Sequence, residues 1–134
     1  MGHQFVVELD NRPGELAHLT RALAARGINI RHISCVGAGS LACAFITCRD
    51  DEAARDVLRT LGHEFVEGET VVADVDDSPG GLAAVTEKLA HAGVTVAGMQ
   101  VVGRRPGVVE MAFSVDDEPK AREALSLTTD DDCV

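Results

Sequence analysis

Apolar residues recur at every second position in two short stretches of the chain, which is the pattern of a half-buried β-strand. Phe5, Val7 and Leu9 form the first stretch, and residues 71, 73 and 75 form the second. Each stretch is followed by an apolar stripe with helical spacing, made of Leu16, Leu19 and Leu23 and then of Leu82, Val85 and Leu89. The pattern therefore predicts a strand followed by an amphipathic helix, twice. Pro13 and Pro79 suit the first turn of these helices.

Two further strands and a second helix are expected in each half. Gly27 and Gly93 stand where a left-handed residue closes a helix. Strands then follow at 28–36 and 41–48, and again at 94–102 and 108–115. Asp50-Asp51 favours a helix start, and the inward face of that helix would be Ala54, Val57, Leu58 and Leu61. A fourth strand within 63–67 completes the first half, whereas only 126–129 offers one in the second.

The two halves are copies of one sequence. Residues 7–16, VELDNRPGEL, return as ADVDDSPGGL at 73–82, a displacement of 66 positions (79 − 13). The order strand, helix, strand, strand, helix, strand predicts an α+β fold of two ferredoxin-like βαββαβ units in tandem, with antiparallel sheets and helices on one face. We expect the first unit at 1–68, the second at 69–129 and an acidic, solvated tail at 130–134. Units of this size bury little core alone, so each is expected to join another.

Composition excludes several classes of function. A net charge of −10, with four Phe and no Trp or Tyr, disfavours nucleic acid as a partner. No apolar run reaches the roughly 20 residues that a membrane span needs. The four cysteines form no CxxC pair, which is typical of thiols in a reducing cytoplasm. We therefore expect a cytoplasmic protein that contacts neither nucleic acid nor membrane.

Motifs for metal binding and catalysis are also missing from the sequence. The five histidines show neither HxxxH nor HExxH spacing. The sequence contains no nucleophile-elbow, P-loop or dinucleotide motif. We expect no metal, no cofactor and no enzymatic activity.

The Pro-Gly segments carry the candidate chemistry. Each precedes a helix N-terminus, where unpaired N–H groups and the helix dipole favour an anion such as an amino-acid carboxylate. Gly14 and Gly80 would let a ligand approach the backbone. Asn11 offers both a donor and an acceptor. Two alternatives remain open: the Pro-Gly pairs only mark a helix start, or Asn11 only caps the helix.

The first copy resembles the ACT domain family of regulatory modules. The resemblance rests on a strand, the Asp-Asn-Arg-Pro-Gly-x-Leu segment at 10–16, the amphipathic helix and the Gly-Ile-Asn-Ile at 27–30, in that order. The resemblance covers both copies. It implies that modules associate side by side, that an amino acid binds between two of them, and that Asn11 and Asn29 contact it. The candidate ligand-binding residues are Asp10, Asn11, Arg12, Pro13, Gly14, Glu15, Leu16, Asn29, Asp77, Ser78, Pro79, Gly80, Gly81 and Leu82.

The second copy departs from this pattern. Asp77, Ser78 and Thr95 replace Asn11, Arg12 and Asn29, so the first loop is the expected primary site. The resemblance implies a regulatory protein that binds a small amino acid, forms a homodimer and acts on a partner enzyme or regulator. The alternatives are a structural or oligomerisation module that has lost the ligand, a regulatory subunit of a partner enzyme, and an enzyme with an unfamiliar site.

Overall fold

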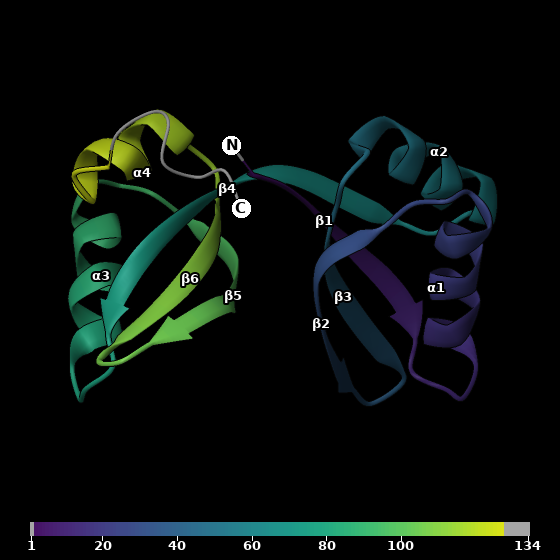
Figure 1. Cartoon of the computed structure of the whole chain (residues 1–134), viewed down its shortest axis with the longest axis horizontal. Helices are drawn as coiled ribbons and strands as arrows, with labels where there is room; N and C mark the ends of the chain where they lie inside the picture. Colours follow the sequence, from purple (N-terminus) through teal and green to yellow (C-terminus); the bar gives the residue numbers. More distant parts are fainter. Residues whose placement is uncertain (1, 128–134) are drawn as a thin grey trace. The chain divides into compact units, whose positions relative to one another are not determined.

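The computed structural model describes residues 2–127, which form six strands and four helices (Figure 1). The first six elements are β1 (Gly2–Asp10), α1 (Glu15–Ala25), β2 (Ile30–Ala38), β3 (Leu41–Cys48), α2 (Asp51–Leu61) and β4 (Phe65–Asp76). The last four are α3 (Gly81–His91), β5 (Val96–Arg105), β6 (Val108–Val115) and α4 (Glu118–Ala124). None of the described helices is long and apolar enough to cross a membrane.

The chain divides into two compact units, and the division falls inside β4. The first unit comprises His3–Glu67, and the second begins at Gly68. Hydrogen-bonded strands follow the order β2-β3-β1-β4 in the first unit and β4-β6-β5 in the second. The pairs β1–β3, β2–β3, β4–β6 and β5–β6 are antiparallel. The predicted α+β, ferredoxin-like fold is confirmed.

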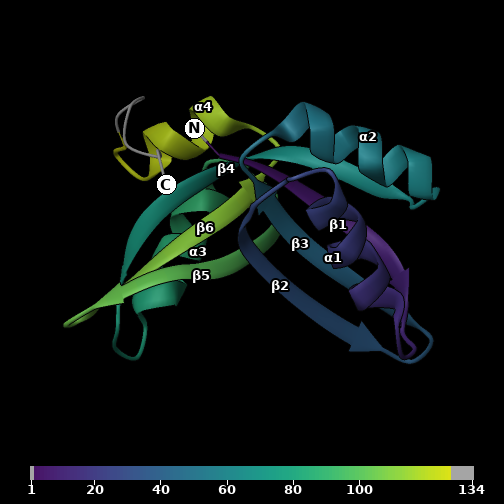
Figure 2. The same ribbon diagram turned by 45° about the vertical axis from the view of Figure 1, so that its right-hand side comes forward.

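Both helices of each unit pack on the same sheet face. In the first unit Phe5, Val7 and Leu9 share one buried cluster with Leu19 of α1 and Val57 of α2. In the second unit the cluster joins β4 and β6 to Leu89 of α3 and Ala121 of α4. Figure 2 shows α1 and α2 covering one side of their strands. Period-2 strands and helical stripes therefore place the core as the sequence predicts.

Helices α2 and α4 begin with a capping aspartate. Asp50 accepts a hydrogen bond from the N–H of Ala53 (3.0 Å), and Asp117 accepts one from the N–H of Lys120 (3.1 Å). Both bonds satisfy an N–H group that the helix itself leaves unpaired. The cap at Asp50 aligns α2 so that Ala54, Val57 and Leu58 are buried and Leu61 packs partly against the core, as predicted.

Several boundaries differ from the predictions. Pro13 and Pro79 lie in the turns before α1 and α3, not in their first helical turn. Strands β2 and β5 begin two residues later than predicted, because the N–H groups of Ile28 and Val94 still bond to the carbonyls of Leu23 and Leu89 in the preceding helices. The strands predicted at 63–67 and 71–75 form the single strand β4, since no turn-forming residue except Gly68 separates them.

The end of the chain was predicted to offer a short strand and an acidic tail. Ser126 lies in a turn with φ 57°, and Leu127 belongs to no strand. The other half of the predicted strand, 128–129, and the predicted tail, 130–134, lie outside the described residues.

Candidate functional site

The Pro-Gly loops lead into helices α1 and α3 without a side-chain cap. Gly14 and Gly80 precede the first helical residues and have left-handed backbones, with φ of 91° and 87°. Neither helix has a hydrogen bond from a capping side chain, in contrast to α2 and α4. The N–H groups at these two helix starts are therefore not capped by a carboxylate, as an anion site requires.

Open space surrounds both glycines. A Cβ built on Gly14 or Gly80 would meet no heavy atom within 4 Å. These positions need glycine for their positive φ, which other L-residues adopt only with strain. The same open space is available to a ligand.

Asn11 holds the first loop against the turn between β2 and β3. Its N–H donates to the carbonyl of Ser40 (2.9 Å), and its Nδ2 donates to the carbonyl of Gly39 (3.0 Å). The side chain also lies against Gly37, where an added Cβ would come within 2.8 Å of it. The alternative that Asn11 caps α1 is wrong, because the residue at the cap position is Gly14.

Charged neighbours flank Arg12 in the same loop. Its guanidinium bonds to Glu15 at 2.7 Å and lies 3.5 Å from the carboxylate of Asp10. All three residues were candidate ligand contacts, and their mutual pairing leaves one excess negative charge at the start of α1. Pro13 is exposed in the turn, and Leu16, in the first turn of α1, is 40% exposed.

The second loop has the same backbone course with different side-chain contacts. The N–H of Asp77 donates to the carbonyl of Gly107 in the turn between β5 and β6 (3.0 Å), as Asn11 does to Ser40. Its carboxylate pairs with Arg104 at 3.5 Å. Ser78 and Pro79 are exposed, and Leu82 packs partly against the second core.

Gly81 is confined by the backbone of its own loop. A Cβ at this position would come within 2.0 Å of the carbonyl oxygen of Asp76. Glu15 occupies the corresponding position of the first loop. The two loops are therefore not equivalent in shape or charge.

Asn29 lies at the opposite end of the first unit from Asn11. The carbonyl of Asn29 accepts a hydrogen bond from Arg49, just after β3 ends, whereas Asn11 is bonded to Ser40, just before β3 begins. The whole of β3, eight residues with a length of about 23 Å, lies between these two points. Within one unit the structure does not bring the two predicted asparagines together.

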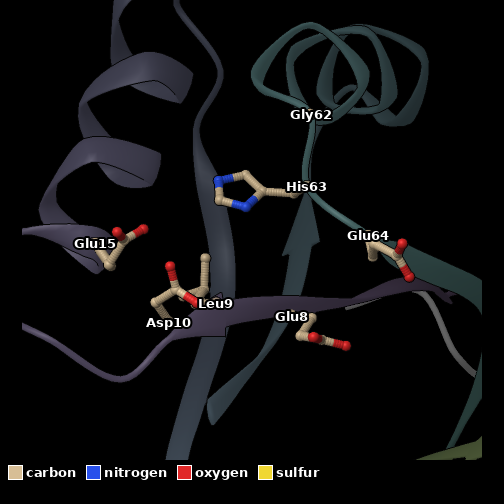
Figure 3. A pocket seen from close by; sticks show the side chains of 7 residues that line it. All are labelled: Glu8, Leu9, Asp10, Glu15, Gly62, His63 and Glu64. Carbon is tan, nitrogen blue, oxygen red and sulfur yellow. The ribbon is translucent and has the colours of Figure 1, made fainter. Parts of the chain in front are cut away.

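A pocket of about 220 Å³ opens beside the first loop (Figure 3). It lies between the end of β1, the start of α1 and the junction of α2 with β4, and is lined by Glu8, Leu9, Asp10, Glu15, Gly62, His63 and Glu64. His63 extends between Asp10 and Glu15 on one side and Glu8 and Glu64 on the other (Figure 3). Two of the four carboxylates, those of Asp10 and Glu15, share the guanidinium of Arg12. The remaining excess negative charge favours a cation or an ammonium group.

Five of these pocket residues are not among the sequence candidates, namely Glu8, Leu9, Gly62, His63 and Glu64. The Nε2 atom of His63 is buried and has no hydrogen-bond partner among the described residues. Two sequence features point to the polar residues among them. Glu8 is a polar position in the alternation of β1, and His63 follows Gly62, which ends α2. No three His, Cys, Asp or Glu side chains among the described residues are grouped as a metal ion requires.

The sequence model of the ACT domain matches residues 3–63, while a search of curated protein sequences finds no match. Solved structures with the same fold include protein BT0572 from Bacteroides thetaiotaomicron, with a TM-score of 0.72 and 22% identity over 92% of this chain and 85% of that one. The regulatory subunit of aspartate kinase from Thermus flavus has a TM-score of 0.70 and 19% identity, over 94% of this chain and 92% of that one. Its counterpart from Thermus thermophilus has a TM-score of 0.66 and 18% identity, over 93% and 89%.

At these identities the structural matches show the fold alone. The sequence match assigns the first unit, residues 3–63, to the ACT domain family. The second unit repeats much of that sequence and follows the same order from its first strand to its second helix. The chain thus contains an ACT domain in its first unit, followed by a second unit that is similar to it.

Proposed function

We propose that this chain binds a small amino acid at the Pro-Gly loop of its first unit and thereby regulates a partner protein, without catalysing a reaction itself. The observation that carries the proposal is the contrast between the four described helices. Helices α2 and α4 are capped by aspartate, whereas α1 and α3 start at left-handed glycines with open space beside them. An amino-acid carboxylate is the kind of anion that such a start accommodates.

The first loop suits the ligand's ammonium group as well. Asn11 uses its Nδ2 to bond Gly39, which leaves the Oδ1 as an acceptor. Asp10 and Glu15 also line the acidic pocket beside the loop. In the second loop the Asp77 carboxylate stands where Asn11 stands in the first, and a carboxylate there would repel that of the ligand.

Contact with Asn29 requires a second module. Since Asn11 and Asn29 lie at opposite ends of the first unit, a ligand held by one loop can meet Asn29 only from another module placed beside it. This geometry supports a site between modules and an associated form of the protein. Several structures with this fold are named as regulatory subunits of aspartate kinase, which supports a regulatory role with a partner enzyme for this chain.

A second candidate is a purely structural association module. The observation in its favour is that Asn11 and Arg12 are both engaged by the protein, Asn11 by the β2–β3 turn and Arg12 by Asp10 and Glu15. In that case the loop residues serve the fold and no ligand is needed.

A thermal-shift panel of the twenty amino acids separates these candidates. A ligand at about a hundred times its Kd adds roughly 2.7 kcal/mol and raises the midpoint by several degrees. We expect one or a few small amino acids to do so. If no amino acid raises the midpoint, the structural module is the better explanation. Turnover of any amino acid in the panel would show that the chain is an enzyme.

The variant that best tests the site is Asn29→Ala, because the structure uses only the backbone of this exposed residue. Its matched control is Thr95→Ala, at the equivalent position of the second copy. We expect Asn29→Ala to abolish the ligand-induced shift and Thr95→Ala to keep it. The reverse result would mean that Thr95 of a second unit, and not Asn29, faces the ligand.

A further inference from the structure

A groove of about 420 Å³ runs along the outer edge of β4 in the second unit. It is lined by Val72, Ala73 and Asp74 of β4, Glu110 of β6, Val85 and Lys88 of α3, and Leu125 and Leu127 after α4. Successive side chains of a strand point to opposite faces of a sheet. Three consecutive β4 residues can therefore line one groove only if it follows the edge of the strand.

In the first unit a neighbouring strand occupies the corresponding position. There the start of β4 lies beside β1, and the N–H of Glu8 donates to the carbonyl of Glu64 (2.9 Å). Phe65 turns inward and packs against Phe5, with 5.9 Å between the ring centroids. In the second unit β6 pairs with Thr70–Asp76, and the groove lies along Val72–Asp74 of the same strand. Helix α4 is also shorter than α2, with 7 residues against 11.

The two sides of the groove differ in chemistry. Its helix side is mostly apolar, since Val85, Leu125 and Leu127 all pack partly against the second core, and Lys88 of α3 is the charged residue that lines this side. Asp74 and Glu110 face each other across β4 and β6 and share one guanidinium, that of Arg105. Asp76, also on this face, is exposed. The open face of the edge therefore carries excess negative charge.

A strand added along this edge would direct its side chains alternately to the two sides of the sheet. One set of its side chains would enter the apolar side, and the intervening set would meet the carboxylates. The sequence of residues 128–134, Thr-Thr-Asp-Asp-Asp-Cys-Val, lacks such an apolar set, because both sets of alternate positions contain an aspartate.

We propose that the β4 edge of the second unit is a docking site for an extended segment of a partner protein, which adds to the sheet as its fourth strand. The backbone of the segment bonds to the edge of Val72–Asp76, as in other cases of strand addition. Its alternate side chains are apolar and fill the groove. The side chains between them are basic and pair with the carboxylates of the open face.

A pair of synthetic heptapeptides tests this proposal on the full-length chain. Thr-Val-Lys-Val-Lys-Val-Thr has the required alternation, and Thr-Val-Glu-Val-Glu-Val-Thr keeps the apolar set with the opposite charge. We expect the lysine peptide to shift the backbone NMR signals of Val72–Asp76 and to bind about tenfold more tightly than the glutamate peptide. Equal binding of both peptides, or no shift at about 1 mM peptide, would overturn the proposal.

Substitutions locate the binding on the molecule. Leu127→Lys places a charge in the groove and should weaken binding of the lysine peptide about tenfold or more. Val101→Lys changes an exposed apolar residue on the opposite edge of the same sheet and should leave it unchanged. Equal loss in both variants would contradict the proposed edge. Removal of residues 128–134 should not weaken binding, and binding that appears only after their removal would identify that segment as the occupant.

Discussion

The glycines of the two Pro-Gly loops are required for different physical reasons. Gly14 and Gly80 have positive φ and no close neighbours, so the cost of a side chain there is backbone strain of about 1–2 kcal/mol. At Gly81 the cost is a direct clash, since its Cβ would come within 2.0 Å of the Asp76 carbonyl oxygen. That oxygen belongs to the end of β4 and cannot move without distorting the strand.

Gly81→Ala should therefore destabilise the second unit more than Gly80→Ala does. Both variants add one methyl group at neighbouring positions, which makes Gly80→Ala the matched control. Urea unfolding monitored by NMR signals from the second core would give the two free energies of unfolding. If Gly80→Ala cost as much as Gly81→Ala, the close approach of Asp76 would not be the reason for a glycine at 81.

The two asparagines assigned to the ligand differ in what they contribute to the fold. Asn11 donates to Gly39, so Asn11→Ala should lower the free energy of unfolding by about 1 kcal/mol even without ligand. The side chain of Asn29 is exposed, and Asn29→Ala should stay within about 0.5 kcal/mol of the parent. Unfolding in ligand-free buffer checks both. A destabilised Asn29→Ala would mean that its effect on binding is indirect.

Helix α2 begins with a side-chain cap whose contribution to stability can be measured. Asp50→Ala removes the acceptor for the Ala53 N–H and should cost about 1 kcal/mol. Asp50→Asn keeps a capping side chain and should cost less than half of that. Thermal unfolding of the three proteins is the measurement. Equal losses in the two variants would assign the effect to charge and not to the cap.

Helix α2 and strand β4 are joined by an ion pair that responds to pH. Arg55 donates two hydrogen bonds to Glu67, at 2.6 and 2.8 Å, and with a smaller contribution from His3 this lowers the pKa of Glu67 from 4.5 to about 2. Because the pKa is lower in the folded state, the stabilisation is fully present above about pH 4.5. It is lost as the pH falls from 4.5 towards 2.

Glu67→Gln should therefore be less stable than the parent at pH 7, and the difference should shrink below pH 4.5. Asp56→Asn removes a carboxylate from an exposed position of the same helix and should show no such pH dependence. Urea midpoints between pH 7 and pH 3 give the comparison. A difference that stays constant over this range would contradict the assigned pKa.

Elements whose signals are local could be predicted from the sequence, and those set by distant residues could not. Strands β3 and β6 have the predicted ends, because turn residues flank each apolar alternation. The fusion of two predicted strands into β4 depends on what pairs with residues 65–76, which no local pattern contains. The acidic pocket was missed for the same reason, since Glu8 and His63 meet only through the fold. The contact of Asn11 with Gly39 likewise depends on the position of the β2–β3 turn.

Each unit exposes apolar side chains along one outer strand. Ile33 on β2 is 42% exposed, although its cross-strand partner Ile46 is buried on the helix-covered face. Met99 on β5 is 40% exposed, and its partner Phe113 is buried. Outer strands with such side chains are sites of association between sheets. We propose that a second module stands beside these strands and that Asn29 thereby reaches a ligand on the other module's loop.

Association through these strands should therefore respond to charge at Ile33 and Met99. We propose that two copies of the chain pair through these strands. Ile33→Lys combined with Met99→Lys should then sediment as a monomer at micromolar concentration where the parent sediments as a dimer, since two unpaired ammonium groups would be buried. The control is Val66→Lys, which alters a 65% exposed residue of β4, on the other sheet face from the core residue Phe65. If amino-acid binding requires two modules from different copies, the double variant should also lose the ligand-induced thermal shift while Val66→Lys keeps it. A monomeric double variant that still bound ligand would show that one copy of the chain supplies the whole site.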